Sequence, residues 1–354
     1  MKVMAINSSP RTGNESKTEL MLSHLVSGMH AAGAEIETVN LRDTTINNCI
    51  GCYTCWTKTP GTCIHKDDMT NDLLPKWLAS DMVVYATPLY NYAMAATLKT
   101  FMERTIPSFL PYFKVHDRRM YHPLRQKNPA VVMLSVAGMP DKSQFDPLSD
   151  HIRFYCSSPG RKLLAEIYRP ASEVMQMPFM EEKMNEILAA TKDAGQELVR
   201  FMQISPETLA KITQTIIDNR SYMKIAKILW NTCISEKVTL KEFAKKNIVP
   251  RCASLEDFLL TLPMSINTKA TFDRKITLQF NFSGQVVEDC FFVIEQGEIT
   301  AHKGIRADSD LTIATPFDIW MDIMTGKADG QQLFFDQKYT ISGDLSLITQ
   351  LFPV

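Results

Sequence analysis

Residues 1–204 alternate short apolar runs with longer segments whose apolar residues recur at helical spacing. The runs predict β-strands over residues 2–7, 35–40, 81–87, 129–136 and 162–169. The segments between them predict helices over 17–32, 67–79, 95–105, 144–155 and 181–203. Strands that alternate with helices in this way pack as a parallel sheet with helices on both faces. We therefore expect the α/β fold class, with a doubly wound sheet.

The order of these segments fits a flavodoxin-like doubly wound five-stranded parallel sheet. In that arrangement a ligand binds beyond the carboxyl ends of the first and third strands. The loops that follow residues 7 and 87 are therefore the first candidates for a binding site.

Beyond residue 204 the pattern changes twice. Residues 205–250 show helical patterns without strands, and we expect a helical connector or a lid there. Residues 251–354 return to strand-like alternation around Gly297, followed by a helical stretch that carries Phe317 and Trp320. We expect a small α+β domain in this last part, so the predicted boundaries are 1–204, 205–250 and 251–354.

The bulk composition excludes several classes of protein. The chain is 45% hydrophobic and 22% charged, which is typical of a soluble globular protein. Its net charge of -1 gives no electrostatic reason to expect nucleic acid as a partner. We find no pattern for a signal peptide or a membrane span, and the scattered Cys156, Cys233, Cys252 and Cys290 suit a reducing compartment. We therefore expect a cytoplasmic protein.

The other four cysteines gather in one short segment, at Cys49, Cys52, Cys55 and Cys63. Two-residue spacers let thiolates converge on one centre, as in an iron-sulfur cluster, and the Pro60-Gly61 turn can return Cys63 to the others. A structural zinc site usually splits its ligands into two pairs, so zinc fits less well. Reduced, half-buried thiols or a reversible disulfide fit the same spacing. The spacing alone leaves the cluster and these alternatives open.

The loop after the first strand, from Ser8 to Thr18, is rich in hydroxyls and leads into a helix. Hydroxyls, backbone N–H groups and a helix N-terminus form an anion site, to which Arg11 and Lys17 add positive charge. The loop lacks both GxxxxGK[ST] and GxGxxG, so an ATP loop and a dinucleotide fold are disfavoured. A monophosphate such as that of FMN fits better, while a polar turn with Ser16 as a helix cap is the plain alternative.

The loop after the third strand, from Thr87 to Met94, carries two tyrosines at the same edge of the sheet. Two tyrosines in this position fit aromatic contact with a bound isoalloxazine ring. They fit equally well a loop that only packs against its neighbour. The fourth strand ends in Ser135-Val-Ala-Gly138, a third loop of small residues at this edge.

These segments together resemble the NAD(P)H-dependent FMN reductase branch of the flavodoxin superfamily, and in particular its iron-sulfur flavoproteins. The resemblance rests on Ser9-Pro10-Arg11, the cysteine segment, the acidic pair Asp67-Asp68 and Thr87-Pro88-Leu89-Tyr90, and it covers about residues 1–200. It implies bound FMN, NAD(P)H as co-substrate, and a dimer or higher homo-oligomer. It gives the following cofactor residues: Ser9, Arg11, Ser16, Lys17 and Thr18 at the phosphate, and Pro88, Leu89, Tyr90, Asn91 and Ser135 along the flavin. It also implies that Cys49, Cys52, Cys55 and Cys63 hold a [4Fe-4S] cluster.

Residues from about 255 to 354 resemble a sterol-carrier-protein-type lipid-binding domain. This resemblance rests on four segments: Gly297-Glu298-Ile299, the run from Ala307 to Ile313, Pro316-Phe317-Asp318-Ile319-Trp320, and Ile341-Ser342-Gly343-Asp344. Such domains enclose an apolar tunnel. The residues expected to line it are Phe317, Trp320, Met321, Met324, Leu333 and Phe334, and the same residues fit an ordinary core.

The predicted function is that of an FMN-dependent oxidoreductase, which passes electrons from NAD(P)H or a reduced carrier to a small-molecule or protein acceptor. A non-enzymatic electron carrier is one alternative. A lipid-binding module with a vestigial flavin domain is another. No catalytic residue can be assigned from the sequence, because the flavin ring would carry the electron chemistry.

Overall fold

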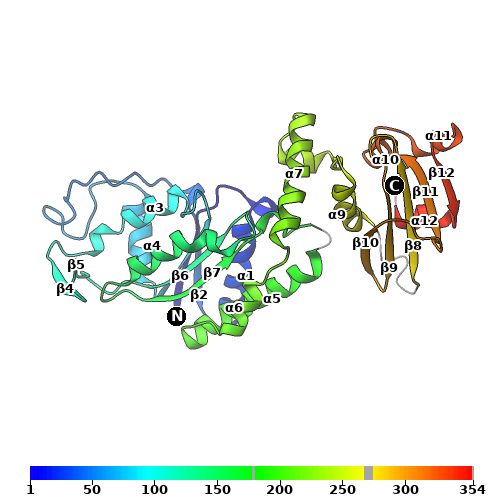
Figure 1. Ribbon diagram of the computed structural model, residues 1–354. Helices are drawn as coiled ribbons and strands as arrows, with labels where there is room; N and C mark the ends of the chain where they lie inside the picture. The colour runs from blue at the N-terminus through cyan, green and yellow to red at the C-terminus, as the bar shows by residue number, and fades with distance from the viewer. Residues whose placement is uncertain (178–179, 267–273, 353–354) are drawn as a thin grey trace. The chain divides into compact units, whose positions relative to one another are not determined.

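The structure is a computed structural model that describes residues 1–177, 180–266 and 274–352. It divides into two compact units, Met1–Ile217 and Asp218–Val354, which are described separately (Figure 1).

A five-stranded parallel sheet forms the centre of the first unit, in the order β2-β1-β3-β6-β7. Its strands are β1 (Lys2–Asn7), β2 (Glu35–Asn40), β3 (Met82–Pro88), β6 (Ala130–Val136) and β7 (Leu163–Arg169). Every residue of β3 is buried, as expected for a strand covered on both faces. The predicted flavodoxin-like α/β sheet is confirmed, with the switch in strand order between β1 and β3.

Helices cover both faces of this sheet. On one face α1 (Lys17–Ala31) packs along α5 (Glu181–Phe201) at Gly28 and Gly195. A Cβ at Gly28 would lie 1.8 Å from the Lys192 carbonyl oxygen, so only glycine permits this approach. On the other face α2 (Leu74–Ala79), its preceding π-helical turn (Met69–Leu73), α3 (Ala96–Glu103) and α4 (Asp146–Cys156) share one apolar core with the strands.

Further elements of this unit lie at its margins. The antiparallel hairpin of β4 (Lys114–His116) and β5 (Arg119–Tyr121) precedes β6. Helix α6 (Pro206–Thr213) follows α5, and Arg169 at the end of β7 donates to the Ile212 carbonyl oxygen at 2.8 Å. Short 3-10 turns occupy Gly13–Glu15, Leu41–Asp43, Ile106–Ser108, Lys142–Phe145 and Ser172–Val174. Helix α6 lies in the first compact unit, within the predicted connector over residues 205–250.

The second unit begins with α7 (Asn219–Glu236), α8 (Leu240–Lys245) and α9 (Leu255–Ser265). Its sheet has the order β10-β9-β8-β11-β12, in which β11 runs parallel to β8 and the other neighbours are antiparallel. The strands are β8 (Ile276–Ser283), β9 (Asp289–Glu295), β10 (Glu298–Lys303), β11 (Leu311–Pro316) and β12 (Thr340–Gly343). The remaining helices are α10 (Phe317–Met324), α11 (Gly330–Phe335) and α12 (Ser346–Leu351). This mixed arrangement confirms the predicted α+β region.

The residues expected to line an apolar tunnel differ in their burial. Phe317, Trp320 and Met321 are buried in the core around Phe258 and Phe280. Met324 and Leu333 pack against that core from its margin, whereas Phe334 is 37% exposed. Throughout the described ranges, no helix combines the length and the apolarity needed to cross a bilayer.

Candidate functional site

The loops after β1, β3, β6 and β7 meet at the carboxyl edge of the first sheet. The Ser8 N–H donates to the Ala86 carbonyl oxygen at 2.9 Å, and the Leu89 N–H donates to that of Val136 at 2.8 Å. The Ser172 N–H in turn donates to the Ala137 carbonyl oxygen at 2.8 Å. These bonds hold neighbouring loops side by side, at the edge where doubly wound sheets bind ligands.

The loop after β1 is held in shape by two buried serines. Ser16 caps α1 by accepting from the Glu19 N–H at 3.1 Å, and its hydroxyl donates to the Ser9 Oγ at 2.8 Å. The Ser9 Oγ also accepts from the Arg11 N–H at 3.2 Å. The loop therefore curls over the start of α1, where helix N–H groups and the positive end of the dipole favour an anion. Thr18 is buried in this first turn.

Two cations stand beside this loop, and an acidic residue accompanies them. The Arg11 side chain is 49% exposed and its Nη1 lies 3.7 Å from the Glu173 Oε1. The Lys17 ammonium donates to the Gln176 amide oxygen. Burial lowers the pKa of Lys17, and Glu173 partly offsets this. Because Glu173 and Gln176 follow β7, the loop after the fifth strand also borders the site.

The loop after β3 ends in a tight turn that presents two tyrosines. The Tyr90 N–H and the Ala93 N–H donate to each other's carbonyl oxygens at 2.9 and 3.0 Å, while Asn91 and Tyr92 adopt φ values of 49° and 65°. Two consecutive positive φ angles define the type I′ turn geometry. Pro88 is buried and Leu89 half-buried, whereas Tyr90 and Asn91 are exposed. The aromatic side chains at this turn are thus available to a ligand.

Ser135 lies near the end of β6, paired in register with Thr87 of β3 and Tyr168 of β7. It is fully buried, and its Oγ has no hydrogen-bond partner among the residues that the structure describes. Buried hydroxyls are normally satisfied, so Ser135 holds unused hydrogen-bonding capacity near the carboxyl edge.

A buried ion pair clamps the base of the cysteine segment. The Arg104 guanidinium donates to both oxygens of Asp67 at 2.6 and 3.0 Å, and to the Asn47 carbonyl oxygen at 2.6 Å. Asp67 also accepts from the Asn47 N–H at 2.9 Å, and Asp68 accepts from the Thr45 N–H at 2.7 Å. Asp67 and Asp68, which follow the cysteine segment, thus bind Asn47 and Thr45, which precede it, and Asp67 also binds Arg104 at the end of α3. This role goes beyond the helix capping expected of such residues.

The pKa of Asp67 reflects these contacts. Burial of the carboxyl would raise its pKa, but hydrogen bonds from Arg104, Asn47 and Thr70 together with the guanidinium charge lower it well below its usual range. For Arg104 burial acts in the opposite direction and lowers the pKa. Asp67 and the adjacent Cys63 outweigh this effect and raise the pKa of Arg104 above its ordinary value. The pair is ionised at neutral pH.

The four cysteines border one hollow of the structure. All of them line a small cavity of about 30 Å³, together with apolar residues and His65. Burial raises the pKa of Cys55, and the neighbouring Cys63, Cys49 and Cys52 raise it further. Hydrogen bonds with Thr54 lower the pKa of the exposed Cys52 thiol.

The chemistry of this donor set fits a cluster held by four thiolates. Two buried nitrogens beside the cysteines, Arg104 Nε and His65 Nε2, have no hydrogen-bond partner in the described ranges, and N–H groups in such positions can donate to cluster sulfurs. Across those same ranges, no three His, Cys, Asp or Glu side chains are close enough to hold a single metal ion.

The strand order and the four loops at the carboxyl edge define a flavodoxin-like domain with a hydroxyl-rich loop at its switch point. Residues 1–144 match the family of NADPH-dependent FMN reductases, and residues 268–354 match the SCP-2 sterol transfer family. The chain thus joins an FMN-reductase-type domain to an SCP-2-type domain.

Individual relatives match the first of these domains. An iron-sulfur flavoprotein of Archaeoglobus fulgidus is 39% identical over 108 residues, which is 30% of this chain and 46% of that protein. An FMN-dependent NADH:quinone oxidoreductase of Alkalilimnicola ehrlichii is 28% identical over 163 residues, 43% of this chain and 76% of that protein. The NAD(P)H:quinone oxidoreductase structure from Methanothermobacter marburgensis superposes with a TM-score of 0.42 at 15% identity, covering 56% of this chain and 96% of that one. The chain spans about half the length of the iron-sulfur flavoproteins that it matches.

Glu173 and Gln176 border the candidate site although the sequence analysis does not predict them. The signal that points to them is positional, because they follow the fifth strand and the carboxyl ends of parallel strands meet at one edge. Arg42 is a third such residue, since its Nη1 donates to the Arg11 carbonyl oxygen at 3.1 Å and lies 3.1 Å from the Glu19 Oε2.

Proposed function

We propose that this protein is an FMN-dependent oxidoreductase that takes electrons from NAD(P)H and passes them to an acceptor. The observation that carries the proposal is that the serine-lined loop at the start of α1 and the tyrosine turn follow the adjacent strands β1 and β3, at the switch point of the sheet. The FMN-reductase family match over residues 1–144 supports it.

Each proposed residue has a defined task. Ser9, Ser16, Thr18 and the first-turn N–H groups of α1 bind the FMN phosphate, and Arg11 and Lys17 neutralise it. Pro88, Leu89, Tyr90 and Asn91 position the flavin ring, and Ser135 supplies a hydroxyl near it. Bound FMN supplies the electron transfer itself, while these residues bind it and orient it.

Arg11 must release Glu173 to reach a phosphate. The ion pair is half-exposed and 3.7 Å long, so its loss costs little, on the order of 1 kcal/mol or less. A phosphate dianion is a stronger partner for a guanidinium than a solvated carboxylate is, because it presents more charge and more acceptor oxygens.

The proposal is tested by the double variant Arg11→Ala, Ser16→Ala, with Ser205→Ala as the matched control. Ser205 caps α6 as Ser16 caps α1, so the control removes a helix cap away from the site. We expect the double variant to lose bound FMN while the control retains it. Equal FMN content in all three proteins, or reduction of the bound flavin by ferredoxin-like donors but not by NADH or NADPH, contradicts the proposal; the second result favours an electron carrier.

We further propose that Cys49, Cys52, Cys55 and Cys63 hold a [4Fe-4S] cluster. Their common cavity and the names of the iron-sulfur flavoprotein relatives support this. Protein purified without oxygen should contain iron and acid-labile sulfide, and Cys55→Ser should lose both. Cys252→Ser is the control, because the Cys252 Sγ lies 3.0 Å from the Thr261 Oγ1 and a hydroxyl can keep that bond. Flavin without iron in the unmodified protein rules the cluster out.

For the second unit we propose binding of an apolar ligand. Its match to the SCP-2 sterol transfer family supports this. Lipid extraction followed by mass spectrometry should recover a bound lipid. Protein that carries no lipid and does not bind a fluorescent fatty acid contradicts this proposal.

A further inference from the structure

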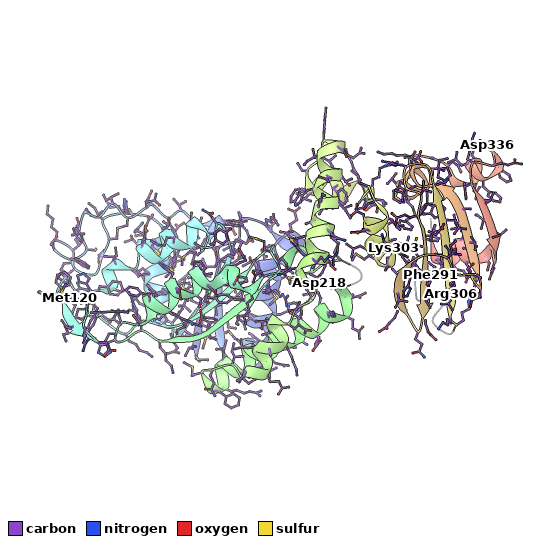
Figure 2. All side chains as sticks on the ribbon, viewed as in Figure 1. Met120, Asp218, Phe291, Lys303, Arg306 and Asp336 are labelled. Carbon is purple, nitrogen blue, oxygen red and sulfur yellow. The ribbon has the colours of Figure 1, made fainter. Side chains whose placement is uncertain are left out.

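The segment that opens the second unit is strongly basic. Residues 218–251 hold eight basic and three acidic side chains, a net charge of +5, whereas the whole chain has a net charge of -1. Asp218, the first residue of this basic segment, is labelled in Figure 2. The average over the chain therefore conceals a local charge that favours an anionic partner.

The three acidic side chains of the basic segment are already engaged. Asp218 and Glu242 cap α7 and α8 by accepting hydrogen bonds from backbone N–H groups at 2.9 and 2.8 Å. Glu236 accepts from the Nζ of Lys327, outside the segment, at 2.7 Å. Six of the eight basic residues are exposed, namely Arg220, Lys227, Lys237, Lys241, Lys245 and Lys246.

Helix α7 is attached to the second unit by one of its faces. Ile228 and Thr232 are buried, and residues four apart lie on the same side of a helix. The Lys224 Nζ donates to the Glu256 Oε2 of α9 at 2.7 Å and fixes the helix against its neighbour. The opposite face of α7 is therefore turned towards solvent.

That opposite face carries an apolar stripe. Met223, Trp230 and Ile234 are 63%, 51% and 73% exposed. They follow one another at intervals of seven and four residues, which places them on one side of the helix. Lys227 and Lys237 occupy the same row at helical spacing. Exposed apolar side chains that gather in this way mark a surface of interaction.

The combination of an apolar stripe with lysines favours a lipid surface as the partner. A helix of this kind lies in the plane of the lipid interface, with its apolar side chains among the headgroups. An indole suits that zone, because its ring is apolar and its N–H is polar. Lysine stems can follow the apolar layer while their ammonium groups reach phosphates. A nucleic acid would use the lysines but leave Met223 and Ile234 in water.

We infer that the exposed face of α7, together with the basic segment, binds the surface of a bilayer that contains anionic phospholipids. Trp230 enters the headgroup region, and the lysines contact lipid phosphates. This inference goes beyond the proposed flavin and apolar-ligand functions, because neither of them involves α7. Binding of this kind brings the second unit to the phase in which apolar ligands dissolve.

The inference is tested by sedimentation of the full-length protein with sucrose-loaded vesicles. One vesicle preparation contains phosphatidylcholine and phosphatidylglycerol in equal parts, and the other contains phosphatidylcholine alone. The test variants are Trp230→Gln, which removes the indole, and the double variant Lys227→Gln, Lys237→Gln, which removes two charges from the same face.

Matched controls come from the same unit but from outside the basic segment. Phe335→Gln removes an aromatic side chain of α11 that is 77% exposed. The double variant Lys275→Gln, Lys338→Gln removes two exposed lysines. These controls separate a specific effect of α7 from a general effect of surface charge or exposed aromatic area.

We expect the unmodified protein and both controls to bind the anionic vesicles, and to bind phosphatidylcholine alone at least about tenfold more weakly. Trp230→Gln should weaken binding to the anionic vesicles about tenfold. The Lys227→Gln, Lys237→Gln protein should bind them about thirtyfold more weakly, because each lysine near such a surface contributes about fivefold.

Equal binding by all of these proteins, or equal binding to the two kinds of vesicle, overturns the inference. A loss confined to the lysine variant also overturns it, because the contact is then ionic and does not use the apolar stripe. So does a change of oligomeric state in Trp230→Gln with unchanged vesicle binding, since the face is then a contact between copies of this chain. Failure of the proposed functions is distinguishable, because flavin and bound lipid are measured on the protein before vesicles are added.

Discussion

The cysteines differ in ways that their spacing does not reveal. Cys52 is exposed and its hydrogen bonds with Thr54 lower the pKa of its thiol, whereas burial raises the pKa of Cys156 and Cys290 to about 12. Thiolates are the reactive form, so Cys52 should be alkylated first and at lower pH than an ordinary cysteine. Iodoacetamide labelling with peptide mass spectrometry checks this, in chelator-treated protein so that no thiol is ligated. Preferential labelling of Cys156 or Cys290 in native protein contradicts it.

The buried Asp67–Arg104 pair gives the second prediction at this scale. Removing one member leaves the other charge unpaired, so Arg104→Met should lower the free energy of unfolding by about 3–5 kcal/mol. Because the folded pKa of Asp67 lies below its unfolded value, the stabilisation is complete above about pH 4 and declines as the pH falls towards the folded pKa. Urea titrations at several pH values measure both effects. In Asp67→Asn the free energy of unfolding should decline less as the pH falls below about 4. An unchanged decline in that variant would show that other carboxyl groups cause it.

At the scale of elements, the contact of α1 with α5 depends on two glycines. Gly28→Ala places a methyl group against the Lys192 backbone, so the helices must separate. We expect a loss of about 1–3 kcal/mol, measured by denaturant unfolding. Ser27→Ala is the control on the exposed face of the same helix. A Gly28→Ala protein as stable as the control would mean that the helices are not in this close contact.

The parallel sheet is predictable from the sequence because its strands are buried, and the run Met82–Pro88 is apolar almost throughout. The β4–β5 hairpin is not, since its side chains are mostly exposed and no core enforces an apolar pattern. Its turn uses Asp117 and Arg118 at positive φ, without the glycine that usually signals such a turn. Tyr53, Trp56 and Arg161 line one pocket although they lie far apart in the sequence, and no local pattern predicts that they come together.

At the scale of the whole molecule, the chain divides after Ile217. If the first unit folds by itself, a protein of residues 1–217 should retain bound FMN and its reduction by NAD(P)H, because the proposed FMN residues all precede residue 136. Flavin absorbance of the purified fragment measures this. If the full chain binds flavin but the fragment is soluble and folded and binds none, the second unit contributes to the site.

The central claim is that the first unit binds FMN and receives electrons from a nicotinamide. Its most direct measurement is anaerobic mixing of the purified full-length protein with NADH or NADPH while the flavin absorbance is followed. We predict stoichiometric FMN that is bleached rapidly by at least one of the two nucleotides, and an Arg11→Ala, Ser16→Ala protein that shows neither flavin nor bleaching. Full-length protein that carries no flavin after reconstitution with FMN, or bound flavin that neither nucleotide reduces, would contradict the claim.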